Sequence, residues 1–210
     1  MLTSEEEARY ARQIVMPQIG EEGQEKLKSS KVLIVGAGGL GSPSAMYLAC
    51  AGVGTIGIVD EDTVSISNLQ RQILHSSESL GMKKVESAKR TLGRLNPHVR
   101  VVAYEMRLSE ERAKDIIAGY DLVVDAVDNL TTRYIVNDTC QELGKPLIEA
   151  GVMHFDGMIL TILPGKGPCF RCVFPSPPPE DVARTPREMG ILGPVPGIIG
   201  CMQAVEAVKV

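Results

Sequence analysis

Three glycines in the stretch "KVLIVGAGGLGS" (residues 31–42) form the pattern Gly36-x-Gly38-x-x-Gly41 after a run of apolar residues. Between a strand and a helix, this pattern places free backbone N–H groups and a helix N-terminus against phosphate oxygens. Asp60 ends the next apolar run, where its carboxylate can accept hydrogen bonds from ribose hydroxyls. These residues predict a nucleotide site and fit NAD as well as ATP. A tight strand–helix turn without a ligand is the structural alternative.

A cluster of polar and cationic side chains follows Asp60 and helps to distinguish the two nucleotides. The loop carries Asn68, Gln70 and Arg71, and Lys84 opens the next predicted helix. Arg71 and Lys84 together can neutralise a triphosphate and stabilise a departing pyrophosphate, for which an NAD site has no need. The pattern therefore favours ATP, although most Arg and Lys side chains are ordinary surface charges.

Two further motifs carry candidate metal ligands. Asp128 and Asn129 follow another predicted strand, and their oxygens suit Mg²⁺, which bridges phosphates. A helix N-cap is the structural alternative for this pair. Cys169-x-x-Cys172 lies among Pro and Gly residues, as half of a four-cysteine zinc site does. No second C-x-x-C occurs in the 210 residues, so two ordinary or redox-capable thiols are an equal alternative.

Strands alternate with helices along most of the chain, which predicts how these residues are positioned. We expect strands at 31–35, 55–60, 99–105, 121–127, 146–151 and 157–163, and helices at 4–15, 21–28, 40–51, 82–95, 109–118 and 131–144. The first helix is expected to start at Ser4, with Glu7 completing a capping box. The alternation predicts an α/β fold with a doubly wound, mostly parallel, Rossmann-like sheet. Ligands bind such sheets beyond the carboxyl ends of the strands, where the glycines, Asp60 and Asp128 all fall.

A single domain is expected over residues 1–210. Its N-terminal helices occupy 1–30, and its nucleotide-binding core occupies 31–163. Residues 164–196 hold nine of the thirteen prolines, which predicts a C-terminal lobe with a long Pro-rich crossover loop over 164–200. The remaining stretch, 201–210, is predicted to be a truncated helix, because the sequence provides no stop signal there.

Composition and charge argue against several classes of protein. The net charge of −4 at pH 7 disfavours a broad nucleic-acid-binding face. The longest apolar stretch, 47–59, is too short to cross a bilayer, and the strongly charged opening segment is unlike a secretory signal. Five scattered Cys residues do not suggest a disulfide framework. These features predict a cytoplasmic protein that binds neither nucleic acid nor membrane.

A series of motifs in order resembles the MoeB/ThiF group, which is the bacterial and archaeal branch of the ubiquitin-activating enzyme superfamily. The resemblance runs from about residue 8 to the last residue, and many separate motifs carry it. These motifs are "RYARQI", "VLIVGAGGLGS", "VDEDTVSISNLQRQ", "GMKKVESAK", "LNP", "DAVDN", "PCFRC" and "PGIIGCMQAVEAVK".

The resemblance implies an adenylation reaction. In this family, the C-terminal glycine carboxylate of a small ubiquitin-like sulfur carrier, which ends in Gly-Gly, attacks the α-phosphate of MgATP and gives an acyl-adenylate and pyrophosphate. Residues 173–200 contain no Cys that could serve in thioester or persulfide transfer, which favours a MoaD-like carrier and molybdopterin cofactor biosynthesis. A ThiS-type carrier in thiamine biosynthesis is the alternative. An NAD-dependent oxidoreductase and a non-catalytic nucleotide-binding protein are further alternatives.

The same resemblance implies a role for each matching residue. Gly39 lies against the phosphates, Asp60 holds the ribose, and Arg12 reaches the phosphates from the partner subunit, which implies a homodimer. The residues that contact phosphates or Mg²⁺ are Asn68, Arg71, Lys84, Asp128 and Asn129, with Asp128 as the magnesium ligand. Cys169 and Cys172 match the first of two zinc-binding pairs, of which the second does not occur in these 210 residues.

Overall fold

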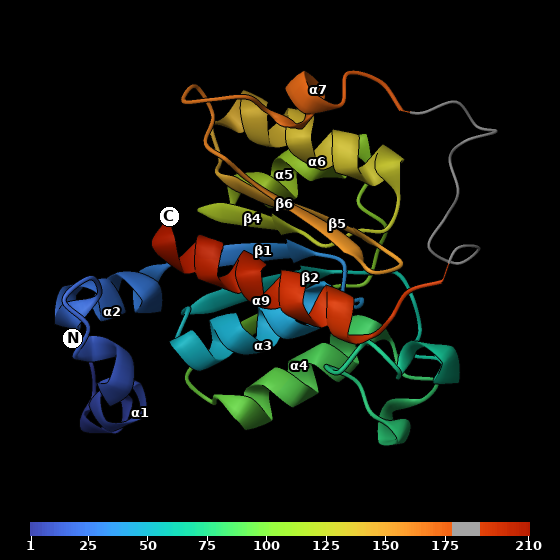
Figure 1. Ribbon diagram of the computed structural model, residues 1–210. Coiled ribbons are helices and arrows are strands. Elements are labelled where there is room, and N and C mark those ends of the chain that lie inside the picture. Colours follow the sequence, from blue (N-terminus) through green and yellow to red (C-terminus); the bar gives the residue numbers. More distant parts are fainter. Residues whose placement is uncertain (178–189) are drawn as a thin grey trace.

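The computed structural model describes residues 1–177 and 190–210. The strands in these residues form a 6-stranded sheet with the order β3-β2-β1-β4-β5-β6 (Figure 1). They are β1 (Lys31–Val35), β2 (Thr55–Val59), β3 (Arg100–Tyr104), β4 (Leu122–Asp125), β5 (Leu147–Met153) and β6 (Asp156–Ile162). β1 to β5 are parallel, and β6 pairs with β5 in the antiparallel direction. The predicted doubly wound, mostly parallel α/β fold is therefore confirmed.

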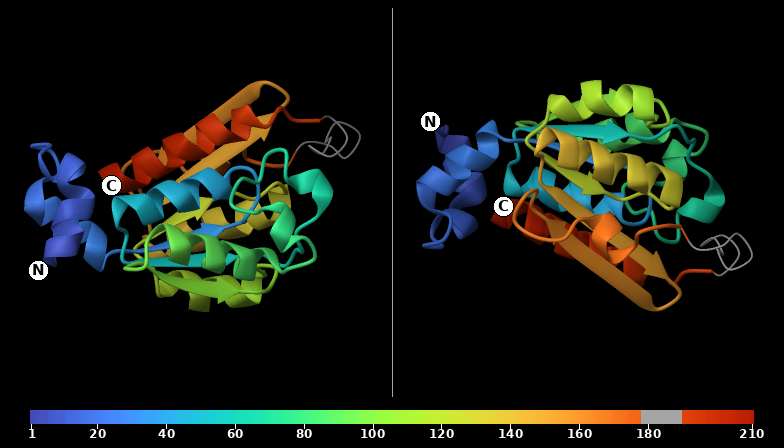
Figure 2. Two further views of the ribbon diagram at one scale, coloured as in Figure 1. Left: turned by 90° about the horizontal axis from the view of Figure 1, so that it is seen from below. Right: turned by 90° about the horizontal axis from the view of Figure 1, so that it is seen from above.

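Helices cover both faces of this sheet (Figure 2). They are α1 (Ser4–Ile14), α2 (Gly20–Ser29), α3 (Gly41–Ala51), α4 (Lys84–Leu95), α5 (Glu110–Ala118), α6 (Leu130–Leu143), α7 (Phe170–Val173) and α9 (Pro194–Lys209), with short 3₁₀ turns η1 (Ile66–Asn68) and η2 (Ser77–Ser79). The core on one face includes residues of α3, α4 and α9, and the core on the other includes residues of α5 and α6. Within β1, Val32 and Ile34 contact the first core and Leu33 and Val35 the second. A strand buried on both faces needs a continuous apolar run, which explains the sequence of β1.

The N-terminal cap of α1 lies one residue earlier than predicted. Thr3, not Ser4, is the N-cap, and Glu6, not Glu7, completes the capping box. Glu6 is buried, and its Oε2 lies 2.7 Å from Nζ of Lys28 on α2. The hydrogen bond from Lys28, together with the Thr3 backbone N–H, lowers the pKa of Glu6 to about 2. The contact with α2 therefore selects which of two neighbouring glutamates forms the cap, and local spacing alone does not reveal it.

α1 and α2 are attached to the sheet at the end away from the glycine turn. Side-chain amides of Gln13 and Gln24 donate to the carbonyl of Ala51, the last residue of α3, at 2.7 and 2.9 Å. Asn96, which follows α4, donates to the Tyr10 hydroxyl at 2.8 Å. Because α3 begins at the glycine turn and ends at these contacts, the whole helix separates α1 from that turn (Figure 1).

The prediction of a crossover loop over 164–200 was wrong for two segments, which are helical. Residues 170–173 form α7, and α9 begins at Pro194 rather than at 201. A proline in the first turn of a helix removes no intrahelical hydrogen bond, so the prolines that suggested a loop are compatible with this helix start. Pro186 and the rest of 178–189 lie outside the described residues. Among the described helices, none is long and apolar enough to cross a membrane.

Candidate active site

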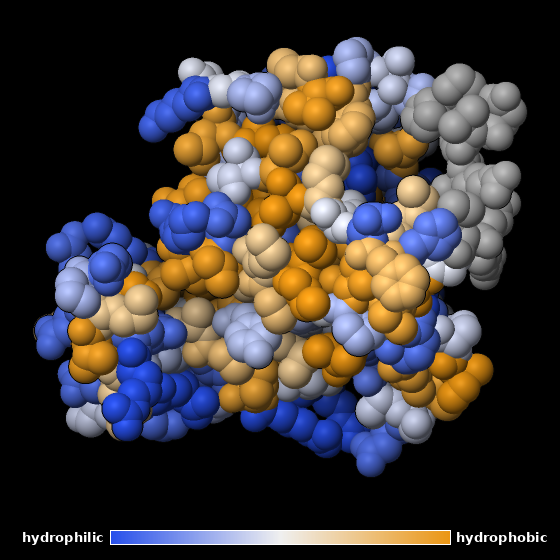
Figure 3. Space-filling model, in the orientation of Figure 1, coloured by the Kyte–Doolittle hydropathy of each residue, from blue (hydrophilic) through white to orange (hydrophobic). Residues whose placement is uncertain are grey.

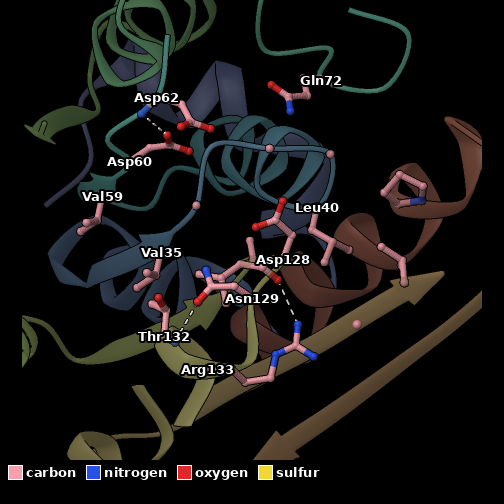
Figure 4. Close-up of a pocket in the computed structure, with 18 of the residues that line it drawn as sticks. Val35, Leu40, Val59, Asp60, Asp62, Gln72, Asp128, Asn129, Thr132 and Arg133 are labelled. Carbon is pink, nitrogen blue, oxygen red and sulfur yellow. Dashed lines mark hydrogen bonds between the residues drawn. The ribbon is translucent and has the colours of Figure 1, made fainter. Parts of the chain in front are cut away.

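A cleft of about 1180 Å³ opens at the carboxyl ends of the strands. Its lining includes most of the residues that the sequence motifs singled out: Gly36, Gly38, Gly39, Asp60, Arg71, Lys84, Asp128 and Asn129. Figure 4 shows Asp60 and Asp62 on one side of the glycine turn and Asp128, Asn129 and Arg133 on the other. Side chains that are distant in sequence meet here because parallel strands end at the same edge of the sheet.

The glycine turn is too tightly packed for side chains at two of its positions. Gly36 has a φ of +103°, and a Cβ there would lie 2.6 Å from the Ala126 carbonyl oxygen. A Cβ at Gly41 would lie 1.9 Å from the carbonyl oxygen of Gly36. At Gly38, by contrast, the nearest atom would be 3.7 Å away, on Gln72. Two of the three glycines are therefore required by the turn itself, and the third leaves the backbone open to the cleft.

Asp60 is held rigidly beside this turn. Its Oδ2 accepts the N–H of Ala37 at 2.8 Å, and its Oδ1 accepts the N–H of Asp62 at 2.8 Å. His75, to which the sequence analysis assigned no role, supports the turn from behind, with Nε2 3.0 Å from the Ala37 carbonyl and Nδ1 2.9 Å from the Ser87 hydroxyl. Burial lowers the pKa of His75, so the neutral ring donates through Nε2.

Two cations line the cleft next to Asp60. Lys84 is the first residue of α4 and is buried, with Nζ 2.7 Å from Oδ2 of Asp62 and 3.9 Å from Oδ2 of Asp60. Arg71 is half-buried, and its Nη1 donates to the Ser67 carbonyl at 3.1 Å. Since Asp62 is largely exposed, its pairing with Lys84 is easily exchanged for another anion. Both cations therefore line the same cleft as the glycine turn.

Two predicted nucleotide contacts from the same loop point elsewhere. The Asn68 side chain accepts the N–H of Ser65 at 3.2 Å and caps η1. Gln70 lies against Gly193, the residue that precedes α9. Neither is among the described residues that line the cleft, whereas Gln72 of this loop is. Asn68 and Gln70 therefore shape the loop that presents Arg71.

The structure separates the two candidate roles of Asp128 and Asn129. Asn129 is the N-cap of α6, and its Oδ1 accepts the N–H of Thr132 at 2.9 Å. Asp128 is exposed in the cleft, and within 1–177 and 190–210 its carboxylate makes no hydrogen bond or ion pair. The N-cap alternative is thus correct for Asn129, whereas the Asp128 carboxylate oxygens, unpaired among the residues that the structure describes, suit a hard cation.

The remaining predicted site residues lie outside the cleft. Arg12 is exposed on α1, beyond the far end of α3. Cys169 is the N-cap of α7 and Cys172 lies within this helix, and their Sγ atoms are 3.6 Å apart, which is close enough for both to hold one metal ion. Among the described residues, no third His, Cys, Asp or Glu joins them in a group that could bind a metal.

Arg133, which the sequence analysis did not select, lines the cleft from the first turn of α6. Its Nη2 donates to the carbonyls of Val127 and Ala150, at 2.9 and 2.8 Å. Its Nε lies 2.8 Å from Oε1 of Glu149, at an angle that does not make a hydrogen bond. Its position in the sequence could have indicated it, because Arg133 follows Asn129 by one helical turn and so lies on the same end of α6.

Glu149 lies beneath this arginine and keeps its proton. It is fully buried on β5, in register with the equally buried Asp125 of β4. Burial, reinforced by the Asp125 carboxylate, raises the pKa of Glu149 to about 11, and the opposing effect of Arg133 does not offset this. Two carboxyl groups this close do not both lose their protons readily in a dry interior, which is why the Glu149 carboxyl group keeps its proton.

Because Glu149 is protonated in the folded protein, the free energy of unfolding should depend on pH. The folded-state pKa of Glu149 lies far above its ordinary value of 4.5, so the unfolded chain binds fewer protons above that value. The contribution of Glu149 to the free energy of unfolding is therefore present at low pH and declines as pH rises, by about 1.4 kcal/mol per pH unit. We expect Glu149→Gln, which mimics the neutral acid, to unfold in urea at a higher midpoint than wild type at pH 8 and to lose this advantage near pH 5.

The exposed Glu111→Gln variant serves as the control for removing one carboxylate. If Glu149→Gln were destabilised equally at both pH values, Glu149 would be an ionised partner of Arg133 and the assignment would fail.

Comparisons with known proteins were made for the whole chain. Residues 10–210 match the ThiF family. "Adenylyltransferase and sulfurtransferase uba4" of Emericella nidulans is 51% identical over 217 residues, which cover 100% of this chain and 45% of that protein. "Adenylyltransferase and sulfurtransferase MOCS3" of Drosophila sechellia is 49% identical over 209 residues, covering 100% of this chain and 46% of that protein. The chain thus spans less than half the length of these curated relatives.

Solved structures agree with this assignment. Escherichia coli MccB with ATP superposes with a TM-score of 0.83 and 26% identity, over 96% of this chain and 62% of that one. PaaA superposes with a TM-score of 0.82 and 28% identity, over 99% of this chain and 66% of that one. The family resemblance seen in the sequence motifs is confirmed: the chain belongs to the ThiF family.

Proposed function

We propose that this chain is an ATP-dependent adenylyltransferase that activates the C-terminal glycine carboxylate of a small ubiquitin-like sulfur carrier. The observation that carries the proposal is the meeting of the glycine turn, two cations and the free Asp128 carboxylate around one cleft. The relatives that are about half identical to this chain are named adenylyltransferases, and MccB of similar fold was solved with ATP.

The proposed reaction forms one bond and breaks one bond. A carboxylate oxygen of the carrier attacks the α-phosphorus, the bond from that phosphorus to the bridging oxygen breaks, and the electron pair leaves with pyrophosphate. Arg71 and Lys84 offset the negative charge that grows on the leaving group. Asp128 fits Mg²⁺ because its oxygens are exposed and unpaired among the described residues, and the ion when bound would supply positive charge that offsets the charge of the triphosphate. The chain itself supplies position and charge, and the step needs no nucleophile of the enzyme.

We propose a MoaD-like carrier and a place in molybdopterin cofactor biosynthesis. The support is the absence of Cys from residues 173–200, since a carrier that is only adenylated needs no transfer thiol on the enzyme. A ThiS-type carrier in thiamine biosynthesis is the second candidate. A zinc ion at Cys169 and Cys172, completed by ligands that the described residues do not supply, and a cytoplasmic location also belong to this proposal.

The proposal includes a homodimer in which Arg12 serves the cleft of the partner subunit. The exposed Arg12 lies at the far end of α3 from its own cleft, which it therefore does not serve. Apolar side chains gather on the face formed by α9 and α3 (Figure 3), where Tyr47, Ile198, Met202 and Val205 are each 45–62% exposed. An apolar patch on two adjacent helices supports association with a second copy.

Calorimetric titration tests the nucleotide. We expect ATP with Mg²⁺ to bind, and NAD neither to bind nor to compete, because Arg71 and Lys84 match a triphosphate. Asp128→Asn should weaken binding of ATP with Mg²⁺ more than binding of ATP alone, since it removes the charge that attracts the ion. Tight NAD binding without heat from ATP would instead support the oxidoreductase alternative.

A further inference from the structure

The cleft extends past the glycine turn to the point where β5 ends and β6 begins, and we call this part the second arm. Gly151, Val152 and Met153 line this arm from β5, and Asp156 and Met158 line it from β6. The cleft measures about 1180 Å³ in total, whereas a site for one small molecule usually measures about 300–1,000 Å³. The second arm therefore leaves room for another group beside a nucleotide.

Arg133 lies where the two parts of the cleft meet. Its Nη2 donates both to the carbonyl of Val127, which precedes Asp128, and to the carbonyl of Ala150, which precedes Gly151. Its side chain is only 11% exposed. The guanidinium is thus fixed between the free carboxylate of Asp128 and the start of the second arm, without needing to reorganise when a ligand arrives.

Nη1 is the guanidinium nitrogen that faces the second arm. A Cβ at Gly151 would lie 3.1 Å from Nη1, compared with 3.9 Å from Cζ and from Nη2. Within residues 1–177 and 190–210, no acceptor forms a hydrogen bond with Nη1, so two N–H donors are unused. Unused donors on a largely desolvated guanidinium favour a carboxylate ligand, which forms charge-assisted hydrogen bonds with them.

The positive charge of Arg133 is also not neutralised by its nearest carboxyl group. Glu149, whose Oε1 lies 2.8 Å from Nε, keeps its proton beside Asp125. Because the Glu149 carboxyl group is neutral, it does not offset the positive charge of Arg133, which can therefore attract an anion in the cleft. An ionised glutamate there would have cancelled the attraction.

We propose that Arg133 binds the terminal carboxylate of the carrier protein and that the second arm receives the carrier's extended tail. This inference rests on the proposed adenylation function. Nη1 donates to one carboxylate oxygen, while the other oxygen faces the nucleotide and attacks the α-phosphorus. The arginine thereby orients the reacting group beside Asp128, which is where the phosphates and their counter-ion are expected.

The test is a binding cycle without ATP, in which no reaction occurs. The probes are a purified MoaD-type carrier ending in Gly-Gly and the same carrier with a C-terminal carboxamide, titrated into the full chain. We expect the carboxamide to bind wild type about tenfold or more weakly, because a hydrogen bond to a charged group is lost. In Arg133→Gln the two carriers should bind with affinities within about twofold of each other. Arg112→Gln, which changes an exposed arginine on α5 outside the lining of the cleft, should retain the full wild-type difference.

Two further variants keep the proposal testable if Arg133→Gln unfolds. Arg133→Lys keeps the positive charge but lacks the planar guanidinium with its several N–H donors, so it should retain part of the difference in affinity between the two carriers. Gly151→Ala removes no hydrogen-bond partner of Arg133 but crowds Nη1, so it should raise the KM for the carrier while leaving the KM for ATP within about twofold. An equal loss in both KM values would indicate a merely structural effect and would overturn the proposal.

The outcomes separate this inference from the function on which it rests. If wild type exchanges pyrophosphate in a carrier-dependent way but Arg133→Gln keeps the carboxamide effect, Arg133 does not bind the carboxylate and the function stands. If the carboxamide binds wild type as well as the natural carrier does, the inference is also wrong. If no Gly-Gly carrier binds or supports exchange, both proposals fail together.

Discussion

Arg71→Ala and Lys84→Ala are each expected to reduce carrier-dependent exchange of pyrophosphate into ATP at least about 100-fold, because each removes a cation that stabilises the charge of the transition state. Such a loss corresponds to about 3 kcal/mol of activation free energy. Both side chains line the cleft next to the glycine turn, and Lys84 is held in the first turn of α4. The measurement is incorporation of labelled pyrophosphate into ATP at saturating carrier.

Two residues of the exposed face of α4 serve as matched controls. Lys89→Ala and Arg90→Ala remove the same charges from the solvent side of the helix and should leave exchange unchanged. Folding of Lys84→Ala should be close to that of wild type, because the exposed Asp62 that loses its partner is solvated by water. Exchange at the wild-type rate in both cleft variants would show that these are ordinary surface charges.

The second large effect is recovery of activity on mixing two inactive variants. Arg12→Ala and Lys84→Ala subunits should each be nearly inactive alone. A mixed dimer combines an intact cleft on the Arg12→Ala chain with an intact arginine from the other chain. Half of randomly mixed dimers are of this kind and each has one intact site, so about a quarter of wild-type exchange should return.

The control mixes Arg71→Ala with Lys84→Ala. Both substitutions alter the same cleft, so no intact site forms in the mixed dimer and no activity should return. Native mass spectrometry of differently tagged chains establishes that exchange of subunits has occurred. Absence of recovery in the first mixture, although mixed dimers are present, would show that Arg12 does not act across an interface.

The order of strands and helices, and the edge of the sheet that holds the cleft, were predictable from the sequence. β1 and β2 can be recognised in the sequence as continuous apolar runs, because both of their faces are buried. Gly36 and Gly41 indicate the turn, because a side chain at either position would collide with the backbone. Asp60 was predictable at the cleft because it directly follows a strand. Each of these signals depends on neighbours within a few positions along the chain.

Contacts between distant segments decided the rest. Whether Thr3 or Ser4 is the N-cap of α1 depends on the contact that Lys28 makes with Glu6. The start of α9 depends on packing against the sheet, where the Gln203 amide donates to the Asp125 carbonyl at 2.7 Å. The sequence shows that Asp128 and Asn129 are adjacent. Only the start of α6 shows that Asn129 is the N-cap, whereas the Asp128 carboxylate has no partner among the described residues. The protonated Glu149 and its neighbour Arg133 come from separate elements, so no local pattern shows that they meet. Periodicity along a chain reports which face of an element is buried, whereas the partner of a buried polar group is set by the packing of elements in space.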